Sequence, residues 1–288
     1  MITVVSFVSC TKDLDRTPKY GNTAASLYVN LDGYRSVLAK VYSGLTLTGN
    51  SGPDGQGDIA GINEGFSSYI RQYWSAQELT TDEAVVGWND ATIKDFHSLS
   101  WSPADVFVRA LYSRIFFQIT LANEFIRESA PAKLAERNLS GADATEIGYM
   151  RAEARFLRAL SYYHALDLFG NVPFVTEGDN VGAFLPTQIS RANLFTYVED
   201  ELKAIETELK DARSNEYGRA DKAAAWALLS RLYLNADVYT GTPKYGDCIT
   251  YCNKVTAVTG YALATNYRNL FLADNNNTGA GEFIFTAL

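Results

Sequence analysis

The sequence predicts an all-α fold, built as a stack of helical pairs with long irregular loops on one side. Three observations predict it. Apolar residues recur at intervals of three and four over most of the chain, which is the period of an amphipathic helix. Glycine and proline separate these periodic segments. The chain has 288 residues and is 47% hydrophobic, so it can bury a sizeable core.

Three helices are expected before residue 130. Residues 32–42 and 66–79 each show helical spacing, and a glycine-rich loop lies between them. Ser102 stands before a proline, and this pair is typical of an N-cap followed by the first helical residue. The helix that it opens should reach about Arg127. It is apolar on more than one side, so we expect it to be buried.

Four further helices are expected in the second half. Residues 146–169 carry apolar side chains at helical spacing, and Gly170 is a C-cap signal. Ser190 is the expected N-cap of the next helix. Residues 219–238 are rich in alanine and, together with residues 246–258, resemble one tetratricopeptide unit. Such pairs stack because none can bury its apolar face alone, and the chain should hold about three to four of them.

Composition excludes several classes of function. The formal net charge of -8 disfavours nucleic-acid binding, which needs a basic surface. Three cysteines cannot form a disulfide framework, and two histidines leave little for a metal site, so we expect neither a metal nor a cofactor. No apolar run reaches the roughly 20 residues that span a bilayer. The unusual feature is the aromatic content of 13%, in which tyrosine outnumbers phenylalanine.

No combination of residues specifies an active site, so we expect no enzyme. Neither a Ser/His/Asp nor a Cys/His arrangement stands out, and no opposed carboxylate pair is defined. His164 lies on an apolar stripe and is expected to be a core histidine with one hydrogen bond, while His97 should have a loop-packing role. Cys248 and Cys252 lie one helical turn apart, which does not suit a disulfide. We expect both to be buried small hydrophobic residues.

The stretch from Tyr69 to Trp101 contains three of the four tryptophans. Polar residues alternate with the rings. A sugar has an apolar face of C–H groups, which stacks on an aromatic plate, and a rim of hydroxyls, which bond amide, carboxylate and guanidinium groups. The alternative is that the rings fill the core under long loops. The residues that offer the plate and the rim are Tyr73, Trp74, Trp88, Asn89 and Asp90.

The first ten residues are apolar and end at Ser9 and Cys10, after which the chain turns polar. A small residue before a cysteine at the end of an apolar stretch is typical of a bacterial lipoprotein signal. The positive segment that normally begins such a signal is missing, so residues 1–10 are expected to be a signal remnant. Cys10 is then the lipidation site and the link to a membrane. The alternative is an apolar N-terminus with an incidental cysteine.

Four stretches of the chain resemble the SusD/RagB family of nutrient-binding outer-membrane lipoproteins of Bacteroidetes. They are the Ser9-Cys10 start and residues 75–84, 151–174 and 223–235. The third stretch is the most specific, because a helix that ends in Leu-Phe-Gly-x-Val-Pro is hard to explain as a generic helix terminus. The resemblance covers nearly the whole chain.

This resemblance implies a tetratricopeptide-like scaffold and no catalysis. Family members capture a glycan, or in some cases a peptide, at the cell surface. They act as the hinged lid of a TonB-dependent, SusC-like transporter, which the helical pairs face. Residues 88–97 look like the subset that binds starch-type α-glucans. Carried over to this chain, Trp88 would be a stacking plate and Asn89 a rim partner, with Arg71 as a further contact.

Two points remain open at the level of sequence. Family members are longer, and this chain ends inside an apolar run, so residues 11–288 are expected to be a SusD-like helical domain that is incomplete at its C-terminus. The alternative functions are a peptide-capturing member of the same family and a helical-repeat protein–protein adaptor whose aromatic residues are core. Burial of Trp74, Trp88 and Trp101 would favour the adaptor.

Overall fold

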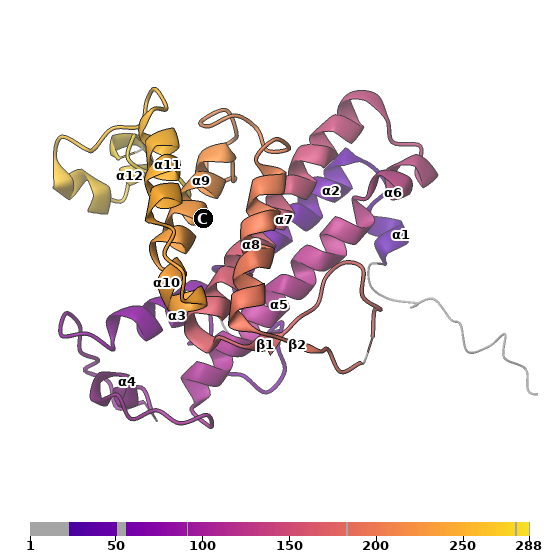
Figure 1. Ribbon diagram of the computed structural model, residues 1–288. Coiled ribbons are helices and arrows are strands. Elements are labelled where there is room, and N and C mark those ends of the chain that lie inside the picture. Colours follow the sequence, from indigo (N-terminus) through magenta and orange to yellow (C-terminus); the bar gives the residue numbers. More distant parts are fainter. Residues whose placement is uncertain (1–22, 51–55, 91, 183, 280, 288) are drawn as a thin grey trace, which may run out of the picture.

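The protein is mainly helical, which confirms the all-α prediction (Figure 1). A computed structural model describes residues 23–50, 56–90, 92–182, 184–279 and 281–287. Within these ranges the helices are α1 (Ala24–Leu27), α2 (Leu31–Ser43), α3 (Tyr69–Glu78), α4 (Lys94–Ser98), α5 (Val106–Glu128), α6 (Pro131–Glu136), α7 (Gly141–Phe169), α8 (Arg191–Ile205), α9 (Lys222–Leu234), α10 (Ala236–Thr240), α11 (Tyr245–Thr256), the 3-10 helix η2 (Tyr267–Phe271) and α12 (Asn275–Thr278). The strands are β1 (Val172–Pro173) and β2 (Gln188–Ile189).

Helices α5, α7, α8, α9 and α11 pack one after another and are here called the helical stack (Figure 1). Helix α7 packs against both α5 and α8, and α9 packs against both α8 and α11. Helix α2 covers α5 and α7, and α3 lies against α5. The antiparallel pair β1–β2 lies in the connection from α7 to α8. The expected arrangement of stacked helices is therefore confirmed.

Several helix ends lie where capping side chains predict them. The hydroxyl of Ser190 accepts a hydrogen bond from the N–H of Asn193 at 3.3 Å, which confirms Ser190 as the N-cap of α8. At the end of α7, Gly170 has a φ of 73°, a conformation that favours glycine, and its N–H donates to the carbonyl of Ala165. Here the sequence signal and the backbone agree.

Two helix predictions are wrong in detail. Helix α5 begins at Val106 and not after Ser102, because the buried carboxylate of Asp105 accepts hydrogen bonds from two N–H groups of the first turn at 2.8 and 2.9 Å. An ionised acceptor caps a helix more strongly than a hydroxyl. The expected helix over residues 219–238 is divided into α9 and α10, because the backbone leaves the helical region at Asn235.

Buried tyrosines explain much of the aromatic content. Tyr34, Tyr69, Tyr162 and Tyr233 are each at most 1% exposed. The hydroxyl of Tyr162, for example, donates to the carbonyl of Val175 at 2.7 Å and accepts from the same residue's N–H at 2.9 Å. A buried hydroxyl that lacked such partners would destabilise the fold. These rings therefore contribute apolar area and a fixed polar contact together.

A buried arginine joins several parts of the helical stack. Arg158 on α7 is 2% exposed, and its guanidinium donates to Asn123 on α5 at 2.8 Å. It also donates to Glu201 on α8 at 3.0 Å and to Glu177 in the loop after β1. Charges are tolerated in a core only when they are paired in this way.

The prediction that both helical cysteines are buried is wrong. Cys252 is exposed and Cys248 is half-buried, and both are free thiols. The reason is the orientation of α11, in which Tyr251 is the buried residue, Cys248 packs at the edge of the core and Cys252 lies on the exposed side. Amphipathic spacing in this short helix did not determine which flank faces α9.

Candidate ligand-binding site

The candidate residues lie in residues 69–105, here called the aromatic arm, which includes α3 and α4 (Figure 1). A small apolar cluster, separate from the main core, joins the arm to α5. It consists of Leu79, Ile93, Phe96 and Phe107. Because these four residues fill the interior, the tryptophans of the arm remain outside. Their exposed fractions are 51% for Trp74, 65% for Trp88 and 45% for Trp101.

This exposure decides between two interpretations of the aromatic stretch. Rings that filled the core under long loops would be buried, and burial of all three tryptophans would have favoured the adaptor interpretation. Large aromatic side chains left in solvent are instead a common feature of binding surfaces. The core interpretation of these tryptophans is therefore wrong, and the arm is the candidate ligand-binding site.

The ring of Trp88 is held by Arg71. The guanidinium carbon of Arg71 lies over the ring, 5.8 Å from its centroid. Arg71 is itself fixed, because its Nη1 donates to the carbonyl of Gly65 at 2.8 Å. A cation over an aromatic face is favourable by about 0.5–1 kcal/mol at an exposed site. Arg71 therefore covers one face of the ring, and a ligand can stack on the other.

Asn89, the next residue, is held by a second cation. The Nζ of Lys94 donates to the side-chain oxygen of Asn89 at 2.6 Å. This hydrogen bond uses the carbonyl oxygen, so the NH2 group is the part of Asn89 that can donate to a ligand hydroxyl. The sequence pattern did not single out Lys94, because a separation of five positions is not a neighbour spacing on a helix. Asp90 is exposed beside them.

The two remaining candidates lie on different sides of α3. Trp74 is exposed and lies three residues after Arg71, so the two share one face of the helix. Tyr73 is half-buried, and its ring centroid lies 4.1 Å from that of His164. The structure thus brings Arg71, Trp88 and Asn89 together and places Tyr73 on the inner side.

His164 is a core histidine with one hydrogen bond, as its place on the apolar stripe predicts. It is 6% exposed, and its Nδ1 lies 2.8 Å from the hydroxyl of Tyr69. Burial lowers the pKa of His164 to about 3, so the ring is neutral at physiological pH. It positions α3 against α7 through its hydrogen bond to Tyr69 and its packing against Tyr73. The other histidine, His97, is exposed on α4.

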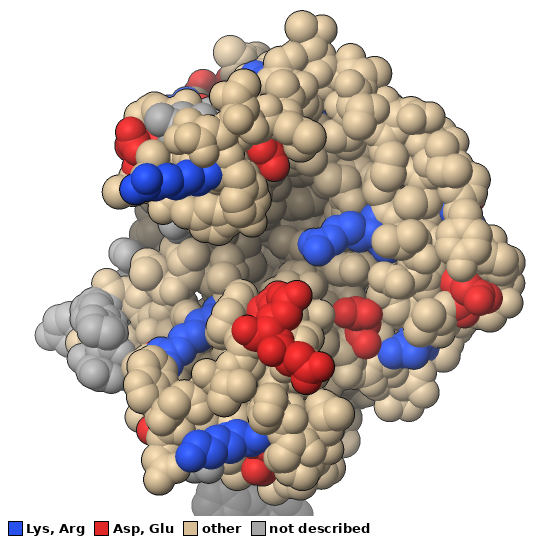
Figure 2. All heavy atoms as spheres, turned by 90° about the vertical axis from the view of Figure 1, so that its left-hand side faces the viewer, with Lys and Arg blue, Asp and Glu red and all other residues tan. Residues whose placement is uncertain are grey.

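The face of the molecule seen in Figure 2 is hollowed. The aromatic arm lies below the hollow, and the part of the chain that holds α12 lies above it. Lysine, arginine, aspartate and glutamate occur around the hollow, but most of the surface there is uncharged. Such a surface suits a neutral ligand, because binding a charged one would require paired charges.

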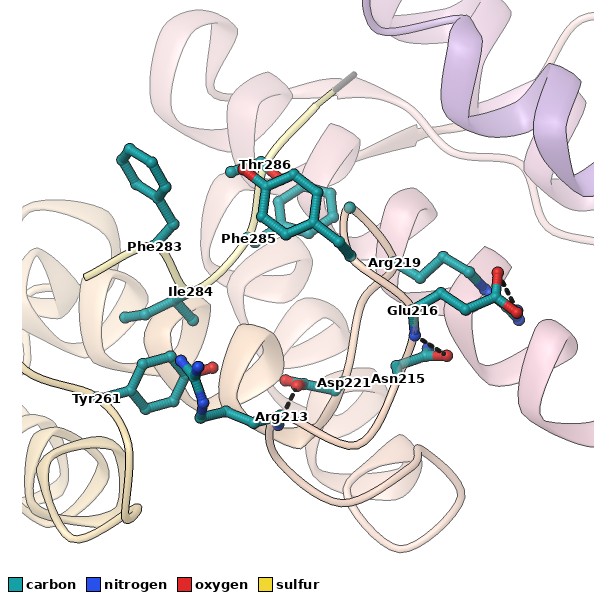
Figure 3. Close-up of a pocket in the computed structure, with 12 residues that line it drawn as sticks. Arg213, Asn215, Glu216, Arg219, Asp221, Tyr261, Phe283, Ile284, Phe285 and Thr286 are labelled. Atoms are coloured by element: carbon teal, nitrogen blue, oxygen red, sulfur yellow. Dashed lines mark hydrogen bonds and ion pairs between the residues drawn. The ribbon is translucent and has the colours of Figure 1, made fainter. Parts of the chain in front are cut away.

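A separate pocket of about 150 Å³ lies between the loop before α9 and the last described residues (Figure 3). Its charged groups bond the protein itself. The guanidinium of Arg213 lies 5.0 Å from the ring centroid of Tyr261, and its backbone N–H donates to Asp221 at 2.6 Å. Arg219 donates to buried Glu153 on α7 at 2.6 Å. We therefore assign this pocket a structural role.

The apolar tail is irregular and carries no helix over residues 282–287. Phe285 packs its ring against Phe156 of α7, with centroids 5.2 Å apart, and lies 6.5 Å from the ring of Tyr42 on α2. The tail therefore joins the core of the helical stack.

Within the described ranges, no three His, Cys, Asp or Glu side chains are grouped closely enough to hold a metal ion. In the same part of the chain, no helix is sufficiently long and apolar to cross a membrane. Residues 1–10, including the expected lipidation site Cys10, lie outside the described residues.

The chain belongs to the SusD-like family. The family described as "SusD-like_3: Starch-binding associating with outer membrane" matches residues 59–234. This span contains every candidate from Arg71 to Asp90 and helices α3 to α9. The family resemblance seen in the sequence is thus confirmed.

Individual relatives agree with this placement. The starch-binding protein SusD of Bacteroides thetaiotaomicron is 39% identical over 269 residues, which cover 93% of this chain and 45% of that protein. A SusD superfamily protein from Parabacteroides distasonis has a similar fold, with a TM-score of 0.67, 24% identity, and coverage of 88% of this chain and 50% of that chain. A laminarin-binding SusD-like protein gives a TM-score of 0.67 at 22% identity, over 89% and 50% of the two chains. The chain thus spans about half the length of the relatives that it matches.

Proposed function

We propose that the chain belongs to a cell-surface glycan-binding protein, which captures a starch-type α-glucan oligosaccharide and passes it to a TonB-dependent, SusC-like transporter. The observation that carries this proposal is the exposed ring of Trp88, covered on one face by Arg71 and followed by the amide of Asn89. Membership of the family and the similarity to a starch-binding relative support it. The role is binding and not catalysis.

The proposed contacts follow from the chemistry of a sugar ring. Its C–H face stacks on the open face of Trp88, while Asn89 donates to one hydroxyl and Asp90 accepts from another. A stacking contact contributes about 0.5–1.5 kcal/mol, and so does a typical hydrogen bond. A few contacts of this size give a modest affinity, which suits a protein that must release its ligand to a transporter.

The test is a titration of the protein with maltoheptaose by isothermal titration calorimetry. Replacing Trp88 by alanine should weaken the affinity about tenfold, because it removes the stacking plate. The matched control is Tyr245→Ala, which removes a 54% exposed ring from α11 on another part of the surface and should leave the affinity unchanged. Laminarin oligosaccharides, titrated in parallel, test whether an α-glucan is the preferred class.

Two results would contradict the proposal in different ways. An unchanged affinity in Trp88→Ala would remove Trp88 from the site. If no α-glucan binds but laminarin or a peptide does, the assignment of an α-glucan as the ligand is wrong.

We also propose that residues 1–10 are a lipoprotein signal remnant and that Cys10 carries the lipid, which places the protein at the outer-membrane surface. Two or more acyl chains on one residue give stable anchoring. In cells, Cys10→Ala should move the protein from the membrane fraction to the soluble fraction, whereas Cys252→Ala should not. Continued anchoring of Cys10→Ala would refute this assignment.

We further propose that residues 11–288 form one SusD-like helical domain, to which further chain is added in the longer family members. One cooperative unfolding transition of the purified chain would support this. Two separated transitions would contradict it.

A further inference from the structure

Two hollows meet at Trp101, away from the Trp88 site. One has a volume of about 310 Å³ and lies between α3, α5 and the end of α7. The other has a volume of about 470 Å³ and lies between α5, the end of α7 and the loop after Trp101. Trp101, Val108, Leu168 and Phe169 line both. Leu168 and Phe169 belong to the Leu-Phe-Gly-x-Val-Pro motif, for which the Trp88 site provides no role.

The walls of these hollows have the composition of a ligand site. They are mainly aromatic and aliphatic, and each hollow holds a few polar groups, which is the usual character of small-molecule sites. Gln77 and Thr80 line the first hollow, and Ser102 and Arg109 line the second. The hydroxyl of Thr80 donates to a backbone carbonyl at 3.1 Å, so its oxygen can still accept from a ligand.

Trp101 itself is held in place while it remains accessible. Its ring centroid lies 6.1 Å from that of Phe96, and Phe96 is 4% exposed. Trp101 is 45% exposed. A ring that is fixed on one side and open on the other is a pre-ordered stacking plate, and pre-ordering reduces the entropy lost on binding.

The position of Trp101 relative to Trp88 follows from α3. Arg71 holds Trp88, and Gln77 lines the hollow beside Trp101; these two residues are about 9 Å apart along the helix axis. Trp74 lies midway between them, three residues from each, and its ring is 51% exposed. Positions three apart are offset by about 60° around an α-helix. Arg71 and Gln77 are therefore about 120° apart around α3, with the exposed Trp74 between them.

We propose that Trp101 is the plate of a second sugar subsite, so that the ligand is an oligosaccharide long enough to cross α3 from Trp88 to Trp101. The C–H face of one sugar unit stacks on Trp101, and Gln77 and Thr80 bond its hydroxyls. A short oligosaccharide reaches the Trp88 end alone. This inference rests on the proposed function and adds to it the minimum length of the ligand.

The test compares a short and a long ligand in the full 288-residue chain. The affinities of maltotriose and maltoheptaose are measured by calorimetry for the wild type, Trp88→Ala and Trp101→Ala. Trp101→Ala should lower the affinity for maltoheptaose about tenfold and change the affinity for maltotriose by less than about twofold, since only the long ligand loses a stacking contact. Trp88→Ala should weaken both ligands. The control is Val85→Ala, which shortens a 68% exposed side chain of the same arm and should change neither.

A second variant keeps the test decisive if Trp101→Ala unfolds in part. Gln77→Ala retains a good helix former in α3 and removes one polar group of the hollow. Gln77→Ala should lower the affinity for maltoheptaose about threefold and leave the affinity for maltotriose unchanged. Thermal unfolding of each variant shows that the arm is still folded.

The outcomes separate the subsite from the proposed function. If Trp88→Ala weakens both ligands while Trp101→Ala and Gln77→Ala weaken neither, the second subsite is refuted and the function stands. If Trp101→Ala lowers the affinities for both ligands equally, Trp101 does not distinguish a long ligand from a short one, and the inference is overturned. If neither ligand binds the wild type, the inference and the α-glucan assignment fail together.

Discussion

The helical stack and the aromatic arm use aromatic side chains in opposite ways. In the stack the prominent rings are tyrosines such as Tyr162, which are buried and have bonded hydroxyls. In the arm they are tryptophans such as Trp88, which remain in solvent beside polar side chains. The comparison teaches that an aromatic excess has no single meaning. A ring stabilises the fold where its polar edge finds a protein partner, and it can bind a ligand where it does not.

The arginines show the same contrast. Arg158 in the stack is 2% exposed and joins α5, α7 and α8 through three side chains. Arg71 in the arm is exposed and covers the face of Trp88. One arginine holds elements of the core together, and the other orients a surface ring. Substitutions in the two regions should therefore separate stability from binding.

The largest effect should come from the charged centre of the stack. Arg158→Ala removes one partner each from Glu177, Glu201 and Asn123, while Glu201 keeps its pair with Arg155 and Glu177 keeps its pair with Arg151. The free energy of unfolding should therefore fall by about 3 kcal/mol, the lower end of the cost of breaking a buried pair. Urea denaturation measures it. The matched control is Arg35→Ala, which breaks an exposed pair with Asp32 and should cost at most about 1 kcal/mol. A cost for Arg158→Ala as small as that of the control would break the comparison.

The next effect concerns the contact between the two regions. His164 has a pKa lowered by burial from 6.5 to about 3, so the unfolded chain binds a proton that the folded chain does not between these values. The contribution of neutral His164 to the free energy of unfolding is complete above pH 6.5 and is lost as the pH falls. At pH 5 the free energy of unfolding should be about 2 kcal/mol lower. Urea denaturation at pH 7.5 and pH 5 measures the loss. His164→Gln keeps an acceptor near Tyr69 but cannot titrate, so its free energy of unfolding should fall less between pH 7.5 and pH 5. An equal fall in the wild type and in His164→Gln would contradict this assignment.

A smaller effect is expected for the buried tyrosine hydroxyls. Tyr162→Phe keeps the ring but removes both hydrogen bonds to Val175, which should cost about 1–3 kcal/mol of unfolding free energy. Tyr245→Phe is the control, because Tyr245 is 54% exposed and its hydroxyl can bond water in both states. Equal costs for the two variants would mean that buried and exposed hydroxyls are equivalent here.

The smallest effect on stability should come from the arm. Trp88→Ala removes a ring that is 65% exposed, so the free energy of unfolding should change by no more than about 0.5 kcal/mol. The same variant should show the loss of ligand affinity described above. A large loss of stability would show that Trp88 is part of the core, and the contrast between the two regions would then fail.

Much of the fold could be predicted because it depends on local patterns. Helical spacing located most of the helices, and Ser190 and Gly170 marked ends that the structure confirms. Where two capping residues lay close together, the sequence pattern did not show at which of them the helix begins. Ser102 and Asp105 are both good capping residues, and only the packing of α5 shows that the buried carboxylate is the cap. The prediction that Cys252 is buried was wrong for a similar reason, because apolar spacing does not show which flank of α11 packs against the core.

The candidate site was predictable in part. The residue types of a plate and a rim identified Trp88 and Asn89, and the family resemblance added Arg71, but neither showed that Arg71 covers Trp88 or that Lys94 holds Asn89. Lys94 reaches Asn89 because a turn lies between them, in which the N–H of Ile93 donates to the carbonyl of Asp90 at 3.0 Å. The hollows beside Trp101 form only where α3, α5 and α7 meet. Tyr73, a candidate by sequence, lies on the inner side of α3 against His164.

The sequence by itself determined the fold class, the family and the stretch in which binding residues occur, because periodicity, caps and motifs are written in neighbouring residues. The tertiary structure decided which rings are buried and which are free, because burial depends on which elements meet. Leu79, Ile93 and Phe96 of the arm pack with Phe107 of α5 and leave the tryptophans of the arm outside. That packing turns an aromatic composition into a surface that can hold a sugar.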